Sequence, residues 1–133
     1  MEKTTCQICE REIKAKKGII AHHGYKRPEQ GWQTDSCMGA RQLPYEKSRE
    51  IIPLAIVKID SFISLTIGKI KQIETENLPI PFINRVINSD NPMYKQRQKE
   101  HIEGLNSQIR MAQKDKERLQ KRYNEWNLIE VTQ

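Results

Sequence analysis

The sequence predicts an α+β protein in which a small N-terminal module of short strands precedes a long helical hairpin. Two observations lead to this prediction. All three cysteines and two of the three histidines fall between residues 6 and 37. From residue 52 onward, apolar residues recur at alternating steps of four and three, which is the spacing of a helical seam. We therefore expect a module over residues 1–50 and a helical hairpin over residues 51–133.

The N-terminal module contains a pattern of residues that bind metals. Cys6 and Cys9 are two residues apart, His22 and His23 follow, and Cys37 comes thirteen residues after His23. Thiolate sulfur and imidazole nitrogen at such spacing are typical of tetrahedral Zn²⁺ sites. An odd number of cysteines argues against a disulfide framework. We expect a Cys3His site made of Cys6, Cys9, His23 and Cys37, with His22 as the alternative to His23.

Around these ligands the sequence predicts short strands and turns. Residues 3–9 should form a strand or knuckle, and residues 12–16 and 18–22 should be two strands around the turn at Lys16-Lys17-Gly18. Gly24, Pro28 and Gly31 then mark a loop that holds Tyr25, Lys26, Arg27 and Trp32. Asp35 or Ser36 could cap a short helical turn that carries Cys37, and Pro44 could start a second over residues 45–52. This order of elements resembles a treble-clef or zinc-ribbon-like finger.

The second half predicts two helices, at about 53–76 and 92–128, separated by a connector at 77–91. Proline and asparagine break the connector, in which one helical turn could occupy residues 82–87. The two apolar seams suggest an antiparallel αα-hairpin or coiled coil, and the narrow seam of the charged second helix favours a homodimer. The seam residues are Ile52, Ile56, Ile59, Ile63, Thr66, Ile70 and Ile73 in the first helix, and Ile102, Leu105, Ile109, Ala112, Leu119, Tyr123 and Trp126 in the second.

The amino-acid composition limits the expected cellular location of the protein and the classes of partner that it could bind. The net charge is +6, hydrophobic residues make up 36% of the chain, and mean hydropathy is −0.79. There is no apolar run long enough for a membrane span and no recognisable export signal, so we expect a cytoplasmic protein with reduced thiols. The positive charge permits binding to nucleic acid or to an acidic protein.

The run CQICEREIKAKKGIIAHHGYKRPEQGWQTDSCMGARQLPYEKSRE, residues 6–50, resembles a family of small uncharacterised phage and prophage proteins with an HHGY-x-RP-x2-GWQT-x-SC-x-GAR signature. The resemblance does not extend to the helices, and the family has no settled activity. It implies a phage-borne origin and a role in the cytoplasm of the bacterial host. An inhibitor or adaptor that acts on a host or defence complex would fit such an origin.

Three classes of function follow. The first is a finger that binds nucleic acid or a nucleoprotein complex. The candidate contact residues are Tyr25, Lys26, Arg27, Trp32 and Arg41, with Lys14, Lys16 and Lys17 widening the basic surface. The second is a protein-interaction module that binds its partner through the helices, and this partner could be a host protein. The third is an HNH-like nuclease with His22 or His23 as base and Asp35 as acid or ligand. We expect no enzyme, because three cysteines and one histidine leave no coordination position open for water.

Overall fold

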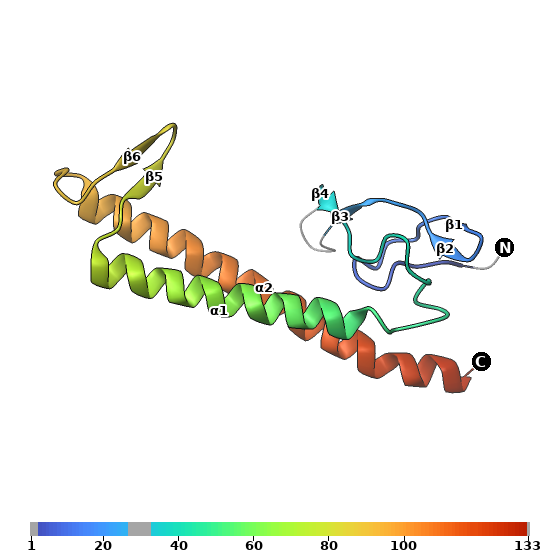
Figure 1. Cartoon of the computed structure of the whole chain (residues 1–133). Helices are drawn as coiled ribbons and strands as arrows, with labels where there is room; N and C mark the ends of the chain where they lie inside the picture. The colour runs from blue at the N-terminus through green and yellow to red at the C-terminus, as the bar shows by residue number, and fades with distance from the viewer. Residues whose placement is uncertain (1–2, 27–32, 133) are drawn as a thin grey trace. The chain divides into compact units, whose positions relative to one another are not determined.

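The chain is described from a computed structural model, which describes the backbone of residues 3–26 and 33–132 and the side chains of residues 3–25 and 36–126. Over these described residues it is an α+β structure with three antiparallel strand pairs and two helices (Figure 1). The chain forms two compact units. Unit 1 comprises Met1–Lys58 and Asp115–Gln133, and unit 2 comprises Ile59–Lys114.

The first strand pair of unit 1 is a tight hairpin. Strand β1 (Ala15–Lys16) pairs with strand β2 (Ile19–Ile20), in the register Ala15↔Ile20 and Lys16↔Ile19. Lys17 and Gly18 connect them with φ values of +55° and +80°. Two successive residues of positive φ suit the twist of a hairpin, and glycine takes this conformation without a steric cost. The predicted turn is confirmed, although both strands are shorter than predicted.

The second strand pair lies where the sequence predicted a loop. Strand β3 (Gly24–Lys26) pairs with strand β4 (Gln33–Ser36), with Gly24 opposite Ser36 and Lys26 opposite Gln33. The prediction of a loop that begins at Gly24 is therefore wrong, as is the predicted helical cap at Asp35 or Ser36. Local glycine and proline signals did not reveal a pairing between residues that are seven to twelve positions apart in the sequence.

Strand β4 leads through turns to helix α1 (Ile52–Glu76). Pro44 begins a turn over residues 45–47 instead of a helix. Pro53 stands in the first turn of α1, where its missing N–H has no intrahelical partner to lose. Asn77, with a φ of +49°, follows the last helical residue as a left-handed cap. Every residue of the predicted α1 seam is buried or half-buried, so the predicted apolar face is confirmed.

The connector after α1 folds into a third hairpin. Strand β5 (Ile80–Phe82) pairs with strand β6 (Arg85–Ile87) in the register Ile80↔Ile87, Pro81↔Val86 and Phe82↔Arg85. The helical turn expected over residues 82–87 is therefore wrong. The physical reason is the alternation along the strands, which buries Ile80 and Ile87 while Pro81 and Val86 stay exposed.

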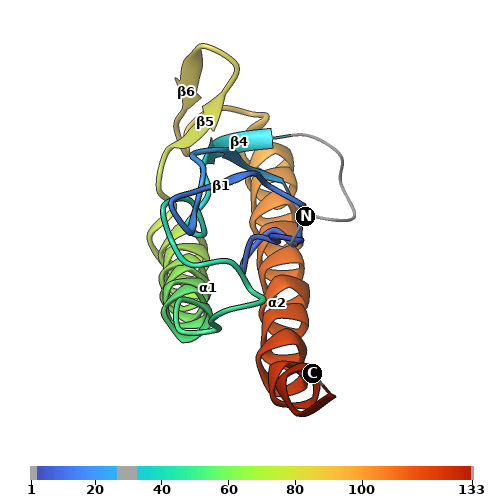
Figure 2. The same cartoon turned by 90° about the vertical axis from the view of Figure 1, so that its right-hand side faces the viewer.

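Helix α2 (Tyr94–Thr132) follows this hairpin after a turn over residues 88–93. The Asn91 side chain accepts a hydrogen bond from the Met93 N–H at 2.8 Å, as an N-cap residue does. In unit 2 the two helices run side by side in opposite directions, joined by the β5–β6 hairpin (Figures 1 and 2). Within the residues described, no helix combines the length and the apolar character that crossing a membrane requires.

The core of unit 2 lies where α1, the hairpin and α2 meet. Gln98 donates to the carbonyl of Ile73 at 3.0 Å, and the Tyr94 hydroxyl donates to the carbonyl of Leu78 at 2.7 Å. These bonds satisfy carbonyls at the end of α1 and just beyond it. The buried residues of this core are Ile73, Ile80, Ile87, Tyr94 and Leu105, with Ile70, Leu78, Phe82 and Ile102 packed at its edge.

Candidate metal centre

The first two candidate ligands lie on a tight knuckle. The Cys6 N–H donates to the Arg11 carbonyl at 2.9 Å, and the Ile8 N–H points at the Cys6 sulfur at 3.4 Å. Glu10, directly after Cys9, has a φ of +65°, which reverses the chain. The backbone thereby turns the sulfur atoms of Cys6 and Cys9 toward the same space.

The other two candidate ligands flank the β3–β4 hairpin. His23 directly precedes β3 and Cys37 directly follows β4, and the Cys37 N–H donates to the His23 carbonyl at 2.9 Å. Strand pairing therefore brings together two residues that are fourteen positions apart in the sequence. The hairpin that the sequence did not predict is the element that closes the site.

The four side chains converge at the spacing of a tetrahedral metal site. Their ligand atoms all lie within 4.8 Å of one another, close enough to hold a metal ion. The Cys6 and Cys37 sulfur atoms are 3.7 Å apart, and the Cys9 sulfur is 3.4 Å from Nε2 of His23. Zinc–ligand bonds of usual length give edges of about 3.8 Å between two sulfur atoms and about 3.6 Å between sulfur and nitrogen. The ligand set that the sequence predicted is compatible with zinc.

The orientation of His23 explains why this histidine faces the site. Its Nδ1 lies 2.8 Å from the carbonyl oxygen of Ala21, to which it donates when Nε2 is left free to bind a metal. Such a bond to the second ring nitrogen is common for histidine ligands, because it fixes the tautomer and the ring orientation. His22 is exposed and does not belong to the cluster.

Burial and mutual contact make the protonation of the three thiols depend on a nearby positive charge. Cys6, Cys9 and Cys37 are between 0% and 3% exposed. Contacts with the sulfur atoms of Cys6 and Cys9, together with burial, raise the pKa of Cys37, whereas hydrogen bonds with Cys37 and Cys6 lower the pKa of Cys9. Three adjacent sulfur atoms cannot all become thiolates unless a positive charge compensates them. A divalent cation at their centre would supply that charge and displace the protons.

Gly39 lets the chain pass close to the site. A Cβ atom at this position would lie 2.1 Å from the Cys6 sulfur and 3.6 Å from the Ile8 side chain. No side chain fits there unless the ligand moves. The sequence pattern around Cys37 contains this glycine, but its role depends on contact with a residue 33 positions away.

The C-terminal part of α2 packs against the knuckle within unit 1. Arg118 donates to the Ile8 carbonyl at 2.9 Å, and Arg122 donates to the carbonyls of Gln7 and Cys6, each at 3.0 Å. Both arginines also contact the Glu10 carboxylate. Sequence reasoning missed these residues, because a run of charges on a helix usually indicates a solvated face.

Aromatic residues extend the same contact. The Tyr45 hydroxyl donates to the Arg122 carbonyl, and the Arg122 guanidinium stacks on the Tyr45 ring at 3.6 Å from its centroid. The indole N–H of Trp126 donates to the Tyr45 carbonyl. Arg49 donates to the Tyr123 carbonyl at 2.9 Å and lies over its ring. These bonds join the segment before α1 to the last turns of α2.

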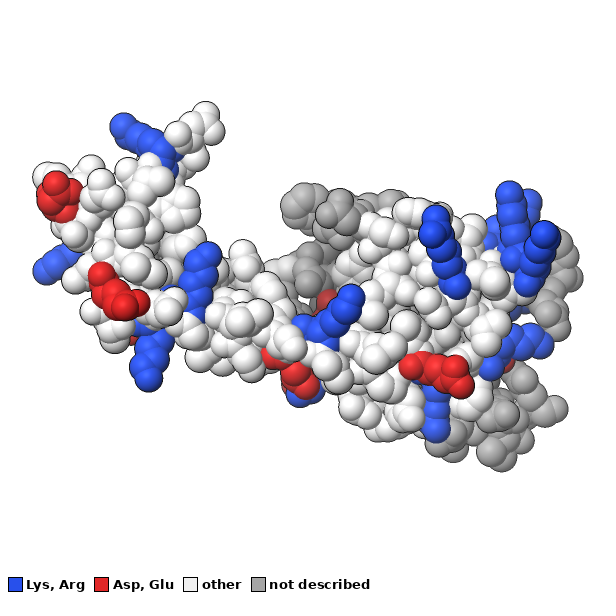
Figure 3. Space-filling model, in the orientation of Figure 1, with Lys and Arg blue, Asp and Glu red and all other residues white. Residues whose placement is uncertain are grey.

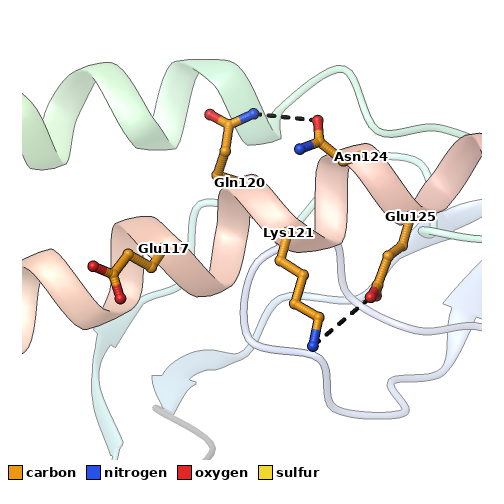
Figure 4. Close-up of a pocket in the computed structure, with 5 residues that line it drawn as sticks. All are labelled: Glu117, Gln120, Lys121, Asn124 and Glu125. Atoms are coloured by element: carbon orange, nitrogen blue, oxygen red, sulfur yellow. Dashed lines mark hydrogen bonds and ion pairs between the residues drawn. The ribbon is translucent and has the colours of Figure 1, made fainter.

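Another face of α2 carries the polar side chains of Glu117, Gln120, Lys121, Asn124 and Glu125. A shallow depression there is lined by residues of this helix alone, with Lys121 paired to Glu125 at 3.8 Å and Gln120 bonded to Asn124 at 3.4 Å (Figure 4). A hollow between neighbouring turns of one helix offers no convergent groups to a ligand. The face of α2 that matters to unit 1 is the face that carries Arg118 and Arg122.

The residues predicted to bind a partner do not form one described surface. The Tyr25 hydroxyl donates to the Asp115 carboxylate at 2.7 Å and lies 3.4 Å from an Arg118 nitrogen, so it takes part in the contact with α2. Arg41 is exposed, with a φ of +65°. Arg27 and Trp32, and the side chains of Lys26 and Asp35, lie outside the described residues. The binding role of Lys26, Arg27 and Trp32 stays a prediction, as does the role of Asp35 in a nuclease.

Comparisons with protein-family models, with curated proteins and with solved structures gave no match to this chain. The interpretation of the site therefore depends on its own geometry and chemistry.

Proposed function

We propose that this protein is a zinc-stabilised binding protein whose finger binds nucleic acid, alone or in a nucleoprotein complex. The observation that carries the proposal is the cluster of three thiols and one imidazole at tetrahedral spacing. Mixed sulfur and nitrogen ligation favours Zn²⁺ over harder divalent ions. Four protein ligands complete a tetrahedron and leave no position for a reacting water, which supports a structural metal rather than a nuclease centre.

The exposed charges of the finger support an anionic partner. Among the described side chains of residues 3–50, the exposed acidic residues are Glu12 and Glu50. The exposed basic residues are Lys3, Lys14, Lys16, Lys17, Arg41 and Lys47. Figure 3 shows basic side chains projecting from the finger, at the right of that view. A surface with this excess of positive charge attracts the phosphates of a nucleic acid.

A groove on the finger lies among these basic residues. It has a volume of about 600 Å³ and runs between the β1–β2 hairpin and the turn after Pro44, with Lys3 and Lys47 in its lining. Glu46 also lines it, but its two carboxylate oxygens accept hydrogen bonds from the Thr5 N–H at 2.7 Å and the Thr5 hydroxyl at 2.6 Å. The acid is thus held by the finger itself, while lysines stand on the groove's wall and on the adjacent hairpin.

The proposal is tested by measuring affinity for DNA and RNA oligonucleotides over a range of salt concentrations. The triple variant Lys14→Gln, Lys16→Gln, Lys17→Gln should weaken binding for all sequences and flatten the salt dependence, by a slope of about 0.9 for each lost phosphate contact. A matched control removes three exposed lysines of α2, through Lys95→Gln, Lys99→Gln and Lys114→Gln. Equal effects of the two triple variants, or no binding by the zinc-loaded protein, would overturn the proposal.

A protein partner is the second candidate, and exposed apolar residues of α1 favour it. Leu54, Val57 and Leu65 are 56%, 61% and 75% exposed. Large apolar side chains that stay exposed often mark protein interfaces. A second copy of the chain, or a host protein targeted by a phage-borne inhibitor, would fit this observation. Sedimentation of the pure protein and a pull-down from bacterial lysate with and without nuclease separate these partners from nucleic acid.

A further inference from the structure

The knuckle backbone is held by side chains from the far end of the chain. Three successive carbonyls, those of Cys6, Gln7 and Ile8, accept hydrogen bonds from Arg118 and Arg122. These carbonyls belong to one metal-ligand residue and to the two residues between the knuckle cysteines. Their orientation fixes how the sulfur atoms of Cys6 and Cys9 point, because the peptide planes between the two cysteines are rigid.

The two guanidinium groups depend on the knuckle in turn. The side chains of Arg118 and Arg122 are only 19% and 13% exposed, and their acidic partners in unit 1 are Glu10 and, for Arg118, also Asp115. A largely buried charge is destabilising unless it is paired and hydrogen-bonded. Zn²⁺ with three thiolates has a net charge of −1, so a loaded site would add a favourable field for both arginines. If the knuckle lost its turn, the three carbonyls would no longer converge on these arginines.

We infer that Arg118 and Arg122 are positioning residues of the metal centre, and that metal occupancy controls whether Asp115–Trp126 of α2 stays docked on the knuckle. The inference rests on the metal binding proposed above, but not on any nucleic-acid partner. Coupling between two equilibria is reciprocal, so residues that the metal helps to dock must strengthen metal binding by the same factor. Release of the segment would uncover Leu119 and Tyr45, which are 1% and 6% exposed when it is docked.

The first test measures zinc affinity by competition with a chromophoric chelator, in the full chain. The variants Arg118→Gln and Arg122→Gln should each bind zinc about 10- to 100-fold more weakly, as is usual when a residue that supports metal ligands is removed. Lys121→Gln is the matched control, because Lys121 is a basic residue of the same helical turns whose side chain is 76% exposed and pairs with Glu125 (Figure 4). Arg122→Lys should recover little of the loss, since one ammonium group cannot serve two carbonyls as the planar fork does.

The second test follows the docked segment itself. In a Trp32→Phe background, Trp126 is the sole tryptophan, and its indole donates to the Tyr45 carbonyl in the docked state. Removal of zinc by a chelator should shift Trp126 emission to longer wavelength, and added zinc should reverse the shift. Cobalt(II) absorption reports in parallel whether tetrahedral thiolate ligation is retained.

Each outcome decides between the proposals. Unchanged zinc affinity in both arginine variants, or unchanged Trp126 emission after zinc removal, overturns this inference and leaves the proposed function intact. A protein that binds no zinc overturns both. If the arginine variants fail to fold, Glu10→Gln replaces them, because it weakens both ion pairs and leaves the three carbonyl bonds; it should lower zinc affinity by a smaller factor than either arginine variant. Affinity equal to that of the unaltered chain would contradict the coupling.

Discussion

The two units of this protein are stabilised in opposite ways. Unit 1 contains three cysteines and one histidine that lie close enough together to hold a metal ion, and polar contacts join residues about 110 positions apart, such as Arg118 with Ile8. Unit 2 is held by apolar packing of Ile73, Ile80, Ile87, Tyr94 and Leu105, which lie within about 30 residues of one another. A small domain that buries little apolar surface needs a cross-link such as a metal ion, whereas two helices and a hairpin can pack around a common hydrophobic core. The units should therefore respond to different perturbations.

The largest effect should come from loss of a metal ligand. Cys9→Ser removes a thiolate from the cluster, and the folding of small metal-bound modules depends almost wholly on the metal, with apparent binding free energies of about 10–16 kcal/mol. Unit 1 should lose its structure, including the docked end of α2, while unit 2 stays folded. Hydrogen exchange should show rapid exchange at Cys6 and Cys37 and continued protection at Ile73 and Leu105. Equal loss of protection in both units would remove the distinction between them.

A core substitution should give the converse result. Ile80 is 1% exposed in the core of unit 2, and its replacement by alanine should lower the stability of that unit by about 2–5 kcal/mol. Zinc affinity should stay unchanged, since unit 1 contains none of the affected contacts. Thermal unfolding followed by circular dichroism measures the first effect and chelator competition the second. Val86→Ala, on the exposed face of the same hairpin, is the control.

A glycine substitution should act on the metal centre alone. In Gly39→Ala the new methyl group would meet the Cys6 sulfur, and crowding of this kind costs about 1–3 kcal/mol. Zinc affinity should fall accordingly. Gly104→Ala is the matched control, because nothing lies within 4 Å of the added atom and alanine favours a helix over glycine by about 1 kcal/mol. It should stabilise unit 2 and leave zinc binding unchanged.

The smallest effect should be a pH dependence confined to unit 2. Burial and the nearby Lys69 lower the pKa of His101 below its usual value of 6.5. The unfolded state therefore takes up a proton at higher pH than the folded state, so unit 2 should lose stability as the pH falls below about 6.5, until it reaches the lowered pKa. Urea unfolding of unit 2 at pH 7.5 and pH 5.5 measures the loss. His101→Gln should abolish the part of the difference that is due to this residue, and an unchanged difference would assign it elsewhere.

The local signals in the sequence predicted a large part of both units. The spacing of Cys6, Cys9, His23 and Cys37 indicated the ligands, Lys17-Gly18 indicated a tight turn, and the four-and-three repeat gave both helices to within a few residues at most termini. These features were predictable because coordination chemistry, turn conformation and helical period each depend on residues that are close in the sequence. The predicted division at residue 50 remains a prediction about autonomous folding, although the packing groups residues 115–133 with residues 1–58.

The sequence by itself determined the kinds of ligand, the helices and the first turn. Only the tertiary structure decided which histidine turns inward, that β3 and β4 pair beside the site, and that Arg118 and Arg122 reach the knuckle. The physical reason is that each of these depends on partners brought together by folding. A charged residue on a helix looks the same in the sequence whether water or a backbone carbonyl 110 residues away accepts its hydrogen bonds.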